Sequence, residues 1–177
     1  MKFEVGQILN SKGRGIFGRL IRWRNSFIYG RRHNWAHSAI ISGVEKERIL
    51  VYEAISKGFV ATYYEEAWLR RKIDEGFFIV GETEIPLKDV KNNADNYLGR
   101  GYGFLDIVHI TIFWIFGTKA KFLFTGAQNL ICSEAVARII YDASEKEINF
   151  EKEFEIPYDL IEPMHLFLSK QIKWQKV

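Results

Sequence analysis

The only cysteine of the chain, Cys132, lies at the start of an amphipathic stretch, "NLICSEAVARIIYDA" (129–143). Apolar residues recur there at helical spacing and Asn129 is a candidate N-cap, so the pattern predicts a helix with the thiol in its first turn. A helix N-terminus offers partial positive charge and unpaired N–H groups, which favour a thiolate and stabilise an oxyanion. Cys132 is therefore a candidate nucleophile, and the alternative is a small buried hydrophobic residue.

A thiol nucleophile needs a base, and His37 is the best candidate among the four histidines. It opens the apolar run "HSAIISG" (37–43), which is followed by the polar turn "VEKE" and a second run, "RILVYEA" (48–54). This pattern predicts a β-hairpin. Antiparallel pairing brings the end of the second strand beside the start of the first, so Glu53 can reach His37 and orient its ring. Taken singly, each residue also suits a structural role, His37 at a strand end and Glu53 on the surface.

The other elements are predicted from local hydrophobic patterns. Strands are predicted at 5–9, 58–64, 76–82 and 164–174, and helices at 15–27, 65–73, 86–99 and 104–116, with a helical turn at 157–163. Strands first, helices later and one closing strand indicate an α+β domain, with helices covering one side of an antiparallel sheet. A chain of 177 residues that is 47% hydrophobic is expected to form a single domain, residues 1–177.

Composition argues against several classes of protein. One cysteine permits no internal disulfide, and the scattered histidines lack zinc-site spacing, so a structural metal is not expected. The N-terminal segment has no apolar signal-peptide core, and the longest apolar run (104–116) is too short to span a bilayer and is interrupted by Asp106 and His109. The expected location is the cytoplasm, with peripheral contact to a membrane or cell wall as an addition.

Positive charge is concentrated near the N-terminus, where no acidic residue lies between Glu4 and Glu45. Interleaved apolar residues give this segment the character of a helix that can touch an anionic membrane or wall surface through Arg14, Arg19, Arg22 and Arg24. The simpler interpretation, which we favour, is a helix packed on the domain with its arginines in water. No nucleic-acid partner is expected.

Six segments, taken together, carry a resemblance to a known family: "VGQIL", "WAHSAIISG", "VYEAISKGFV", "YLGRGYGFLD", "LICSEAVARII" and "IPYDLIEP". In this order they resemble the circularly permuted branch of the NlpC/P60 papain-like superfamily (YaeF/YiiX-like) and, more distantly, the lecithin:retinol acyltransferase-like enzymes. The resemblance covers nearly the whole chain. It implies a papain-like α+β fold with a barrel-like antiparallel sheet packed against helices, permuted so that the His strand precedes the Cys helix. Two positions depart from the pattern, Gln7 in place of an acidic residue and Ile156 in place of a hydroxyl residue.

The resemblance also implies a function, a cysteine peptidase, amidase or acyl hydrolase that needs no cofactor. By position, Cys132 is the nucleophile, His37 the general base and acid, and Glu53 the third member of the triad. Tyr102 would line the substrate pocket, although a core tyrosine fits equally well. The implied substrate is an amide or ester carbonyl of a cell-wall peptide or a lipid acyl group, and it would pass through a thioester acyl-enzyme. The alternative is a non-catalytic lipid- or wall-binding module on the same scaffold.

Overall fold

The computed structural model describes residues 2–13, 15–30, 35–103 and 129–175. Its elements follow in the order β1 (Ile8–Ser11), α1 (Gly15–Ile28), β2 (His37–Val44), β3 (Arg48–Ile55), β4 (Gly58–Glu65), α2 (Glu66–Asp74), β5 (Phe78–Thr83), α3 (Val90–Asp95), β6 (Gly101–Tyr102), β7 (Asn129–Leu130), α5 (Cys132–Ala143), α6 (Phe150–Phe154), the 3-10 helix η1 (Tyr158–Leu160), α7 (Pro163–Leu168) and β8 (Ile172–Trp174). The predicted helix at 104–116 lies outside the described residues.

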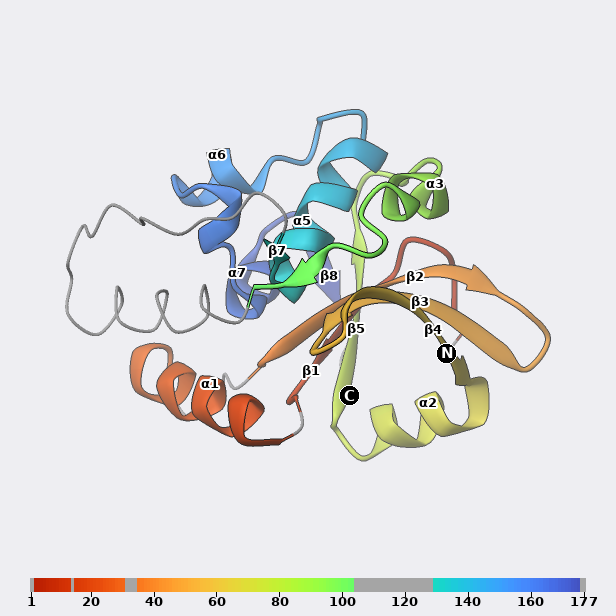
Figure 1. Ribbon diagram of the computed structural model, residues 1–177, viewed down its shortest axis with the longest axis horizontal. Helices are drawn as coiled ribbons and strands as arrows, with labels where there is room; N and C mark the ends of the chain where they lie inside the picture. Colours follow the sequence, from red (N-terminus) through yellow and green to blue (C-terminus); the bar gives the residue numbers. More distant parts are fainter. Residues whose placement is uncertain (1, 14, 31–34, 104–128, 176–177) are drawn as a thin grey trace.

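A six-stranded antiparallel sheet forms the centre of the molecule, in the order β4-β3-β2-β1-β5-β8 (Figure 1). The β2–β3 hairpin predicted from the sequence is present, and the α+β class with an antiparallel sheet is confirmed. A second, two-stranded sheet pairs β6 with β7 in parallel.

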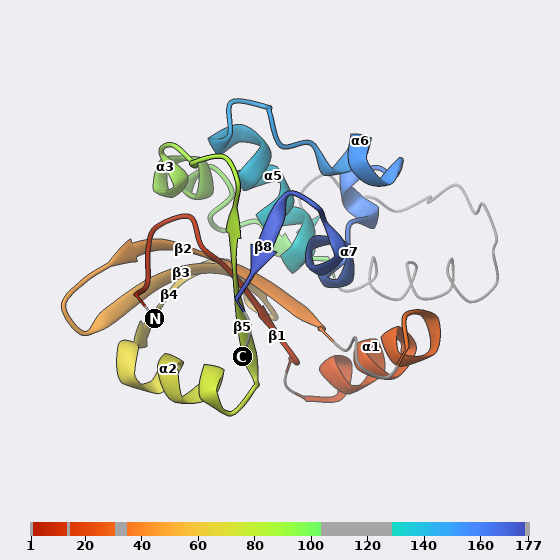
Figure 2. The ribbon, with the colours of Figure 1, turned by 180° about the vertical axis from the view of Figure 1, so that it is seen from behind.

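Helices cover both faces of the sheet, so the prediction of helices on one side only is wrong. Helices α3, α5, α6 and α7 lie on one side and α2 lies on the other, as the view from behind also shows (Figures 1 and 2). The cause is the two-residue alternation of strands, because both faces of the central strands are apolar. One core cluster joins Ile8 and Ile40 to α5, and the other joins Leu9 and Ile41 to α2.

Three predicted elements show the largest differences from the structure. The first strand begins at Ile8, because Gly6, with φ at 93°, forms a turn before it. The helix predicted at 86–99 forms only over Val90–Asp95. The closing strand predicted at 164–174 is instead the helix α7 followed by the short strand β8. Pro163 at the first helical position and a capping box between Glu162 and His165 start α7 and end the extended chain.

Helix α1 covers its predicted range, but the prediction that its arginines face water is wrong for two of them. The Arg22 side chain donates to the backbone oxygens of Lys12 and Gly13, the latter at 2.9 Å. Arg24 is buried and forms an ion pair with Glu162 of the distant C-terminal region. Arg19 is exposed, and Arg14 lies outside the described residues. Within the described ranges, no helix is long and apolar enough to cross a membrane.

Candidate active site

The start of α5 holds the cysteine. Cys132 is the first residue of the helix, so the prediction that it lies in the first turn is confirmed. The predicted Asn129 cap is wrong, because Asn129 belongs to β7 and the N-cap is Ile131, which has no side-chain cap bond. The Glu134 side chain caps the start of the helix by accepting a hydrogen bond from the Ile131 N–H. Because the N-cap supplies no acceptor, the first N–H groups of α5 are left to other partners. The Ser133 N–H is one of them, and it donates to the Cys132 sulfur.

The β2–β3 hairpin brings the other two predicted site residues together. His37 opens β2, and Glu53 lies opposite Ala39 near the end of β3. Residues 37, 39 and 53 therefore share one face of the sheet, and the His37 Nε2 lies 2.9 Å from a Glu53 carboxylate oxygen. This contact confirms the geometric prediction that antiparallel pairing carries Glu53 to His37.

His37 also contacts the thiol, so it joins all three residues. Its side chain is hydrogen-bonded to Cys132 as well as to Glu53. Because Nε2 is engaged by the carboxylate, the ring has Nδ1 left for the sulfur. The backbone N–H of Ser38, on the same strand, is a further donor to the sulfur. The sequence did not indicate this contribution, because it comes from the main chain.

The carboxylate of Glu53 is held from a third strand, β4. Its second oxygen accepts a hydrogen bond of 2.7 Å from the Tyr64 hydroxyl, and the Thr62 side chain donates to the same carboxylate. Trp68 stacks on Tyr64 with a ring separation of 5.1 Å, which steadies the phenol. Sequence reasoning missed both β4 residues, although the alternation of β4 places Thr62 and Tyr64 on one face.

These contacts favour a thiolate–imidazolium pair. Burial alone raises the pKa of Cys132, but the charge and hydrogen bond of His37, with the two backbone N–H groups, outweigh burial and lower this pKa below its ordinary value. Burial likewise lowers the pKa of His37, but the thiolate and Glu53 together raise it to about 10. Burial opposes the ionised form of Glu53 too, yet its hydrogen bonds hold its pKa below the usual range. The site thus favours the charged pair, a thiolate and an imidazolium, over the neutral pair.

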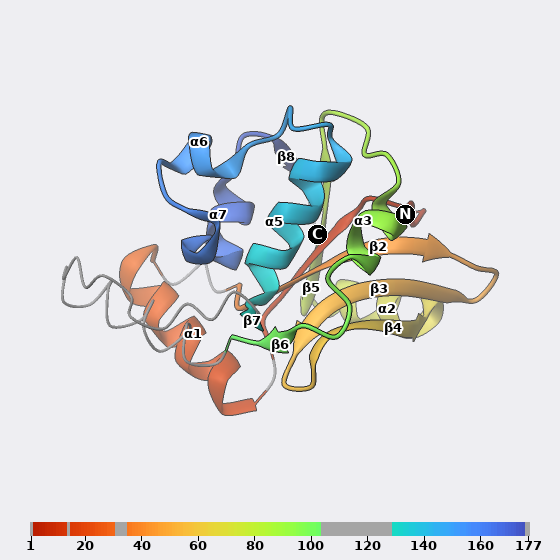
Figure 3. The same ribbon diagram turned by 45° about the horizontal axis from the view of Figure 1, so that its top comes forward.

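Tyr102, the fourth predicted site residue, lies beside the thiol. Its strand β6 pairs with β7, which leads directly into α5 (Figure 3). Burial, followed by the negative charge of Cys132, raises the pKa of Tyr102 well above its ordinary value. Gly58 allows the segment before β6 to approach β4, because a Cβ atom there would lie 2.5 Å from the Arg100 oxygen.

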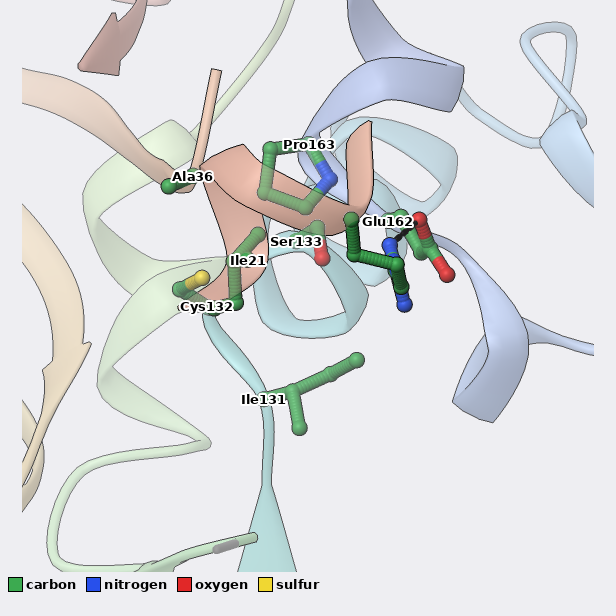
Figure 4. Close-up of a pocket in the computed structure, with 8 residues that line it drawn as sticks. Ile21, Ala36, Ile131, Cys132, Ser133, Glu162 and Pro163 are labelled. Atoms are coloured by element: carbon green, nitrogen blue, oxygen red, sulfur yellow. Dashed lines mark hydrogen bonds and ion pairs between the residues drawn. The ribbon is translucent and has the colours of Figure 1, made fainter. Parts of the chain in front are cut away.

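Two hollows meet at the site. A cleft of about 570 Å³ is lined by His37, Glu53 and Tyr102 together with an aromatic wall from Tyr64, Trp68, Phe77 and Phe78. A much smaller hollow, about 30 Å³, holds Cys132, with Glu162 at its far end (Figure 4). Ile21 and Ala36 line both, so the two hollows adjoin at these residues. The thiol itself is only 4% exposed.

The buried Arg24–Glu162 pair beside this hollow was not foreseen from the sequence, since its partners are 138 positions apart. His165 accepts a hydrogen bond from the Glu162 backbone N–H at 3.0 Å and caps α7, whereas His109 lies outside the described residues. Across the described residues, no group of three or more His, Cys, Asp or Glu side chains is arranged to hold a metal ion.

No model of a known protein family matches this chain, and no curated protein matches it at a significant level. The function of the site is therefore argued from its geometry and chemistry.

Proposed function

We propose that the protein is a cysteine hydrolase that cleaves an amide or ester through a Cys132–His37–Glu53 triad. The observation that carries this proposal is the position of His37, which is hydrogen-bonded to the thiol on one side and to a carboxylate on the other. A structural cysteine needs no such partner, whereas a nucleophile needs a base whose second nitrogen is oriented by a third group.

The reaction would proceed in two steps. The Cys132 thiolate attacks the substrate carbonyl, and the imidazolium of His37 protonates the leaving amine or alcohol, which leaves a thioester on the sulfur. Water then attacks the thioester while His37 accepts its proton, and the acid and the free thiol are released. The backbone N–H groups at the start of α5 are suitably placed to stabilise the developing oxyanion, and Glu53 holds the imidazole orientation.

The resemblance to the permuted NlpC/P60 papain-like branch supports the same assignment. In that branch the His strand comes before the Cys helix, and here His37 lies in β2 whereas Cys132 begins α5. The papain-like architecture with a barrel-like sheet, and the substrate classes of a cell-wall peptide or a lipid acyl group, are parts of this proposal. The cleft beside His37 is large enough for part of either substrate.

One observation favours a second candidate, a non-catalytic binding module. Cys132 is almost fully buried, and it lines the small hollow and not the large cleft. A binding module would use the cleft and keep Cys132 as a packed residue. The two candidates differ in whether a carbonyl can reach the sulfur.

An acyl-enzyme experiment separates them. Short-chain p-nitrophenyl esters and a fluorogenic peptide amide are incubated with the wild-type protein, Cys132→Ser and His37→Ala, and intact mass spectra are taken after acid quenching. The hydrolase is expected to show an acyl adduct and steady turnover, both lost in Cys132→Ser, with turnover lost in His37→Ala. If no substrate yields an adduct or turnover dependent on Cys132, the binding module is the better assignment.

A further inference from the structure

Helix α1 is oriented opposite to an ordinary surface helix. Its polar residues Arg22, Arg24 and Asn25 face the protein, while large apolar side chains face outward. Phe27 is 87% exposed and Trp23 62%, and Leu20 and Ile28 are about 40% exposed. Most surface helices bury the apolar face and expose the charged one. The inward polar side and outward apolar side of α1 therefore require a physical reason.

Polar contacts attach the inner side of α1, together with Ile21, which packs against Ile131. Arg24 is paired with Glu162, and Asn25 donates to the Trp35 oxygen at 2.7 Å. Arg22 donates to two backbone oxygens of the segment before the helix. Charge-assisted hydrogen bonds hold this side, and among the described residues the outward apolar side chains stay largely exposed. These outward apolar side chains are therefore free to bind a partner.

The outward side chains form one continuous stripe. Leu20, Trp23 and Phe27 are spaced three and four residues apart, so they lie on the same face of the helix. The Trp23 and Phe27 rings lie 6.3 Å apart. Exposed Arg19 lies on the turn next to them, and no acidic residue occurs in the chain between Glu4 and Glu45.

We propose that this stripe docks the protein on an anionic phospholipid bilayer, with Trp23 and Phe27 in the boundary between headgroups and acyl chains and Arg19 at the phosphates. Tryptophan suits that boundary because one end of its ring is apolar and the other is polar. Charge complementarity selects the lipid over a second copy of the chain. Two such faces would bring two Arg19 side chains together with no acidic residue of the 5–44 segment to offset them, whereas an anionic leaflet attracts them.

The docked helix also lies next to the candidate active site. Gly18 and Ile21, on the inner side of α1, line the large cleft that contains His37. An α-helix with its side chains is about 10 Å across, so docking through the outer side holds the cleft about one helix diameter from the headgroups. This surface does not depend on catalysis, because none of its residues belongs to the triad.

Vesicle binding tests the proposal independently of the chemistry. Cys132→Ser protein is titrated with vesicles of phosphatidylcholine alone or mixed with phosphatidylglycerol, and the partition coefficient is measured by sedimentation. We expect binding to the anionic vesicles, weakened roughly tenfold or more in Trp23→Gln/Phe27→Gln because two large apolar side chains are lost. Arg19→Glu is expected to weaken binding to the anionic vesicles more than to the neutral ones.

A matched control replaces two other exposed apolar residues, Leu98→Gln/Leu168→Gln, each 44% exposed in the native protein. The control is expected to bind as the parent does. The proposal is overturned if the parent binds neither vesicle, if Trp23→Gln/Phe27→Gln binds as well as the parent, or if the stripe instead drives dimerisation in sedimentation velocity without vesicle binding. When Trp23→Gln/Phe27→Gln is made in the protein that retains Cys132, hydrolysis of a short soluble ester is expected to be unchanged. A loss of this hydrolysis would count against the proposed function and not against membrane docking.

Discussion

Replacing His37 with alanine is expected to change how the reactivity of Cys132 depends on pH. Cys132 is the only thiol in the chain, so alkylation by iodoacetamide reports on this residue alone. In the wild-type protein, the charge and hydrogen bond of His37 hold the pKa of Cys132 below its ordinary value despite burial. The fraction of thiolate therefore falls less on acidification than that of an ordinary thiol, and the rate is expected to fall correspondingly less between pH 9 and pH 6.

The magnitude follows from the fraction of thiolate. A thiol with an ordinary pKa of about 8.5 loses roughly 200-fold in thiolate between pH 9 and pH 6. In His37→Ala the burial that raises the pKa of Cys132 remains and its cationic partner is gone, so this pKa is expected to rise and the loss of rate to increase toward this size. A less acidic thiolate is also the better nucleophile, which offsets part of the loss when absolute rates are compared. The ratio of the two rates within each protein is therefore the better measure.

At alkaline pH the ion pair is lost through His37 and not through Cys132. The pKa of His37 is raised to about 10, so the stabilisation that its charge provides is complete below about pH 6.5 and is lost as the pH rises through about 10. Glu53→Gln is expected to give an intermediate profile, because it removes the carboxylate that also raises the pKa of His37. A wild-type rate that falls about 200-fold toward pH 6, or a His37→Ala profile as flat as the wild-type one, would refute the ion-pair reasoning.

Three further variants test the elements that position the site. Gly58→Ala is expected to destabilise the fold by about 2 kcal/mol or more in urea unfolding, whereas Gly99→Ala, with positive φ but no close neighbour, is expected to cost only about 1 kcal/mol; equal losses would contradict the close-approach argument. Arg24→Met is expected to cost about 3–5 kcal/mol, most of it recovered by adding Glu162→Gln, while the double variant is expected to bind anionic vesicles less well than its parent. Ile21→Ala is expected to speed labelling of the thiol by a bulky maleimide more than by iodoacetamide, and an unchanged ratio would show that this side chain does not limit access.

The His37–Glu53 contact was predictable because its causes are local in the sequence. Two alternating apolar runs around a polar turn determine a hairpin, and the pairing fixes which residues meet. The contact between His37 and Cys132 has no such local cause. It depends on where α5 packs on the sheet, which hydrophobic periodicity does not specify, so only the order of the family-like segments suggested it.

At the start of α5 and at the predicted closing strand, the sequence contains signals of a helix start that were not used in predicting the boundaries. Glu134 lies three residues after Ile131, the spacing of a capping box, and it indicates a helix start later than Asn129. Pro163 followed by His165 likewise indicates a helix start where a strand was predicted. In both places the capping chemistry is a better guide to the boundary than the apolar pattern.

Helix α1 shows why amphipathicity alone cannot decide which face of a helix is buried. Its periodicity separates a polar side from an apolar side, but burial depends on the partner, and here the partner is an acidic side chain far along the chain. A buried ion pair adds little stability over well-packed apolar residues, because desolvation cancels much of the attraction. The Arg24–Glu162 pair can instead determine how α1 is rotated about its axis. If apolar contacts alone attached α1, the side with Trp23 and Phe27 would gain most by turning inward. Since a buried Arg24 cannot leave Glu162 without a large cost, the pair fixes the rotation of the helix and keeps the apolar stripe outside, next to the cleft that holds His37.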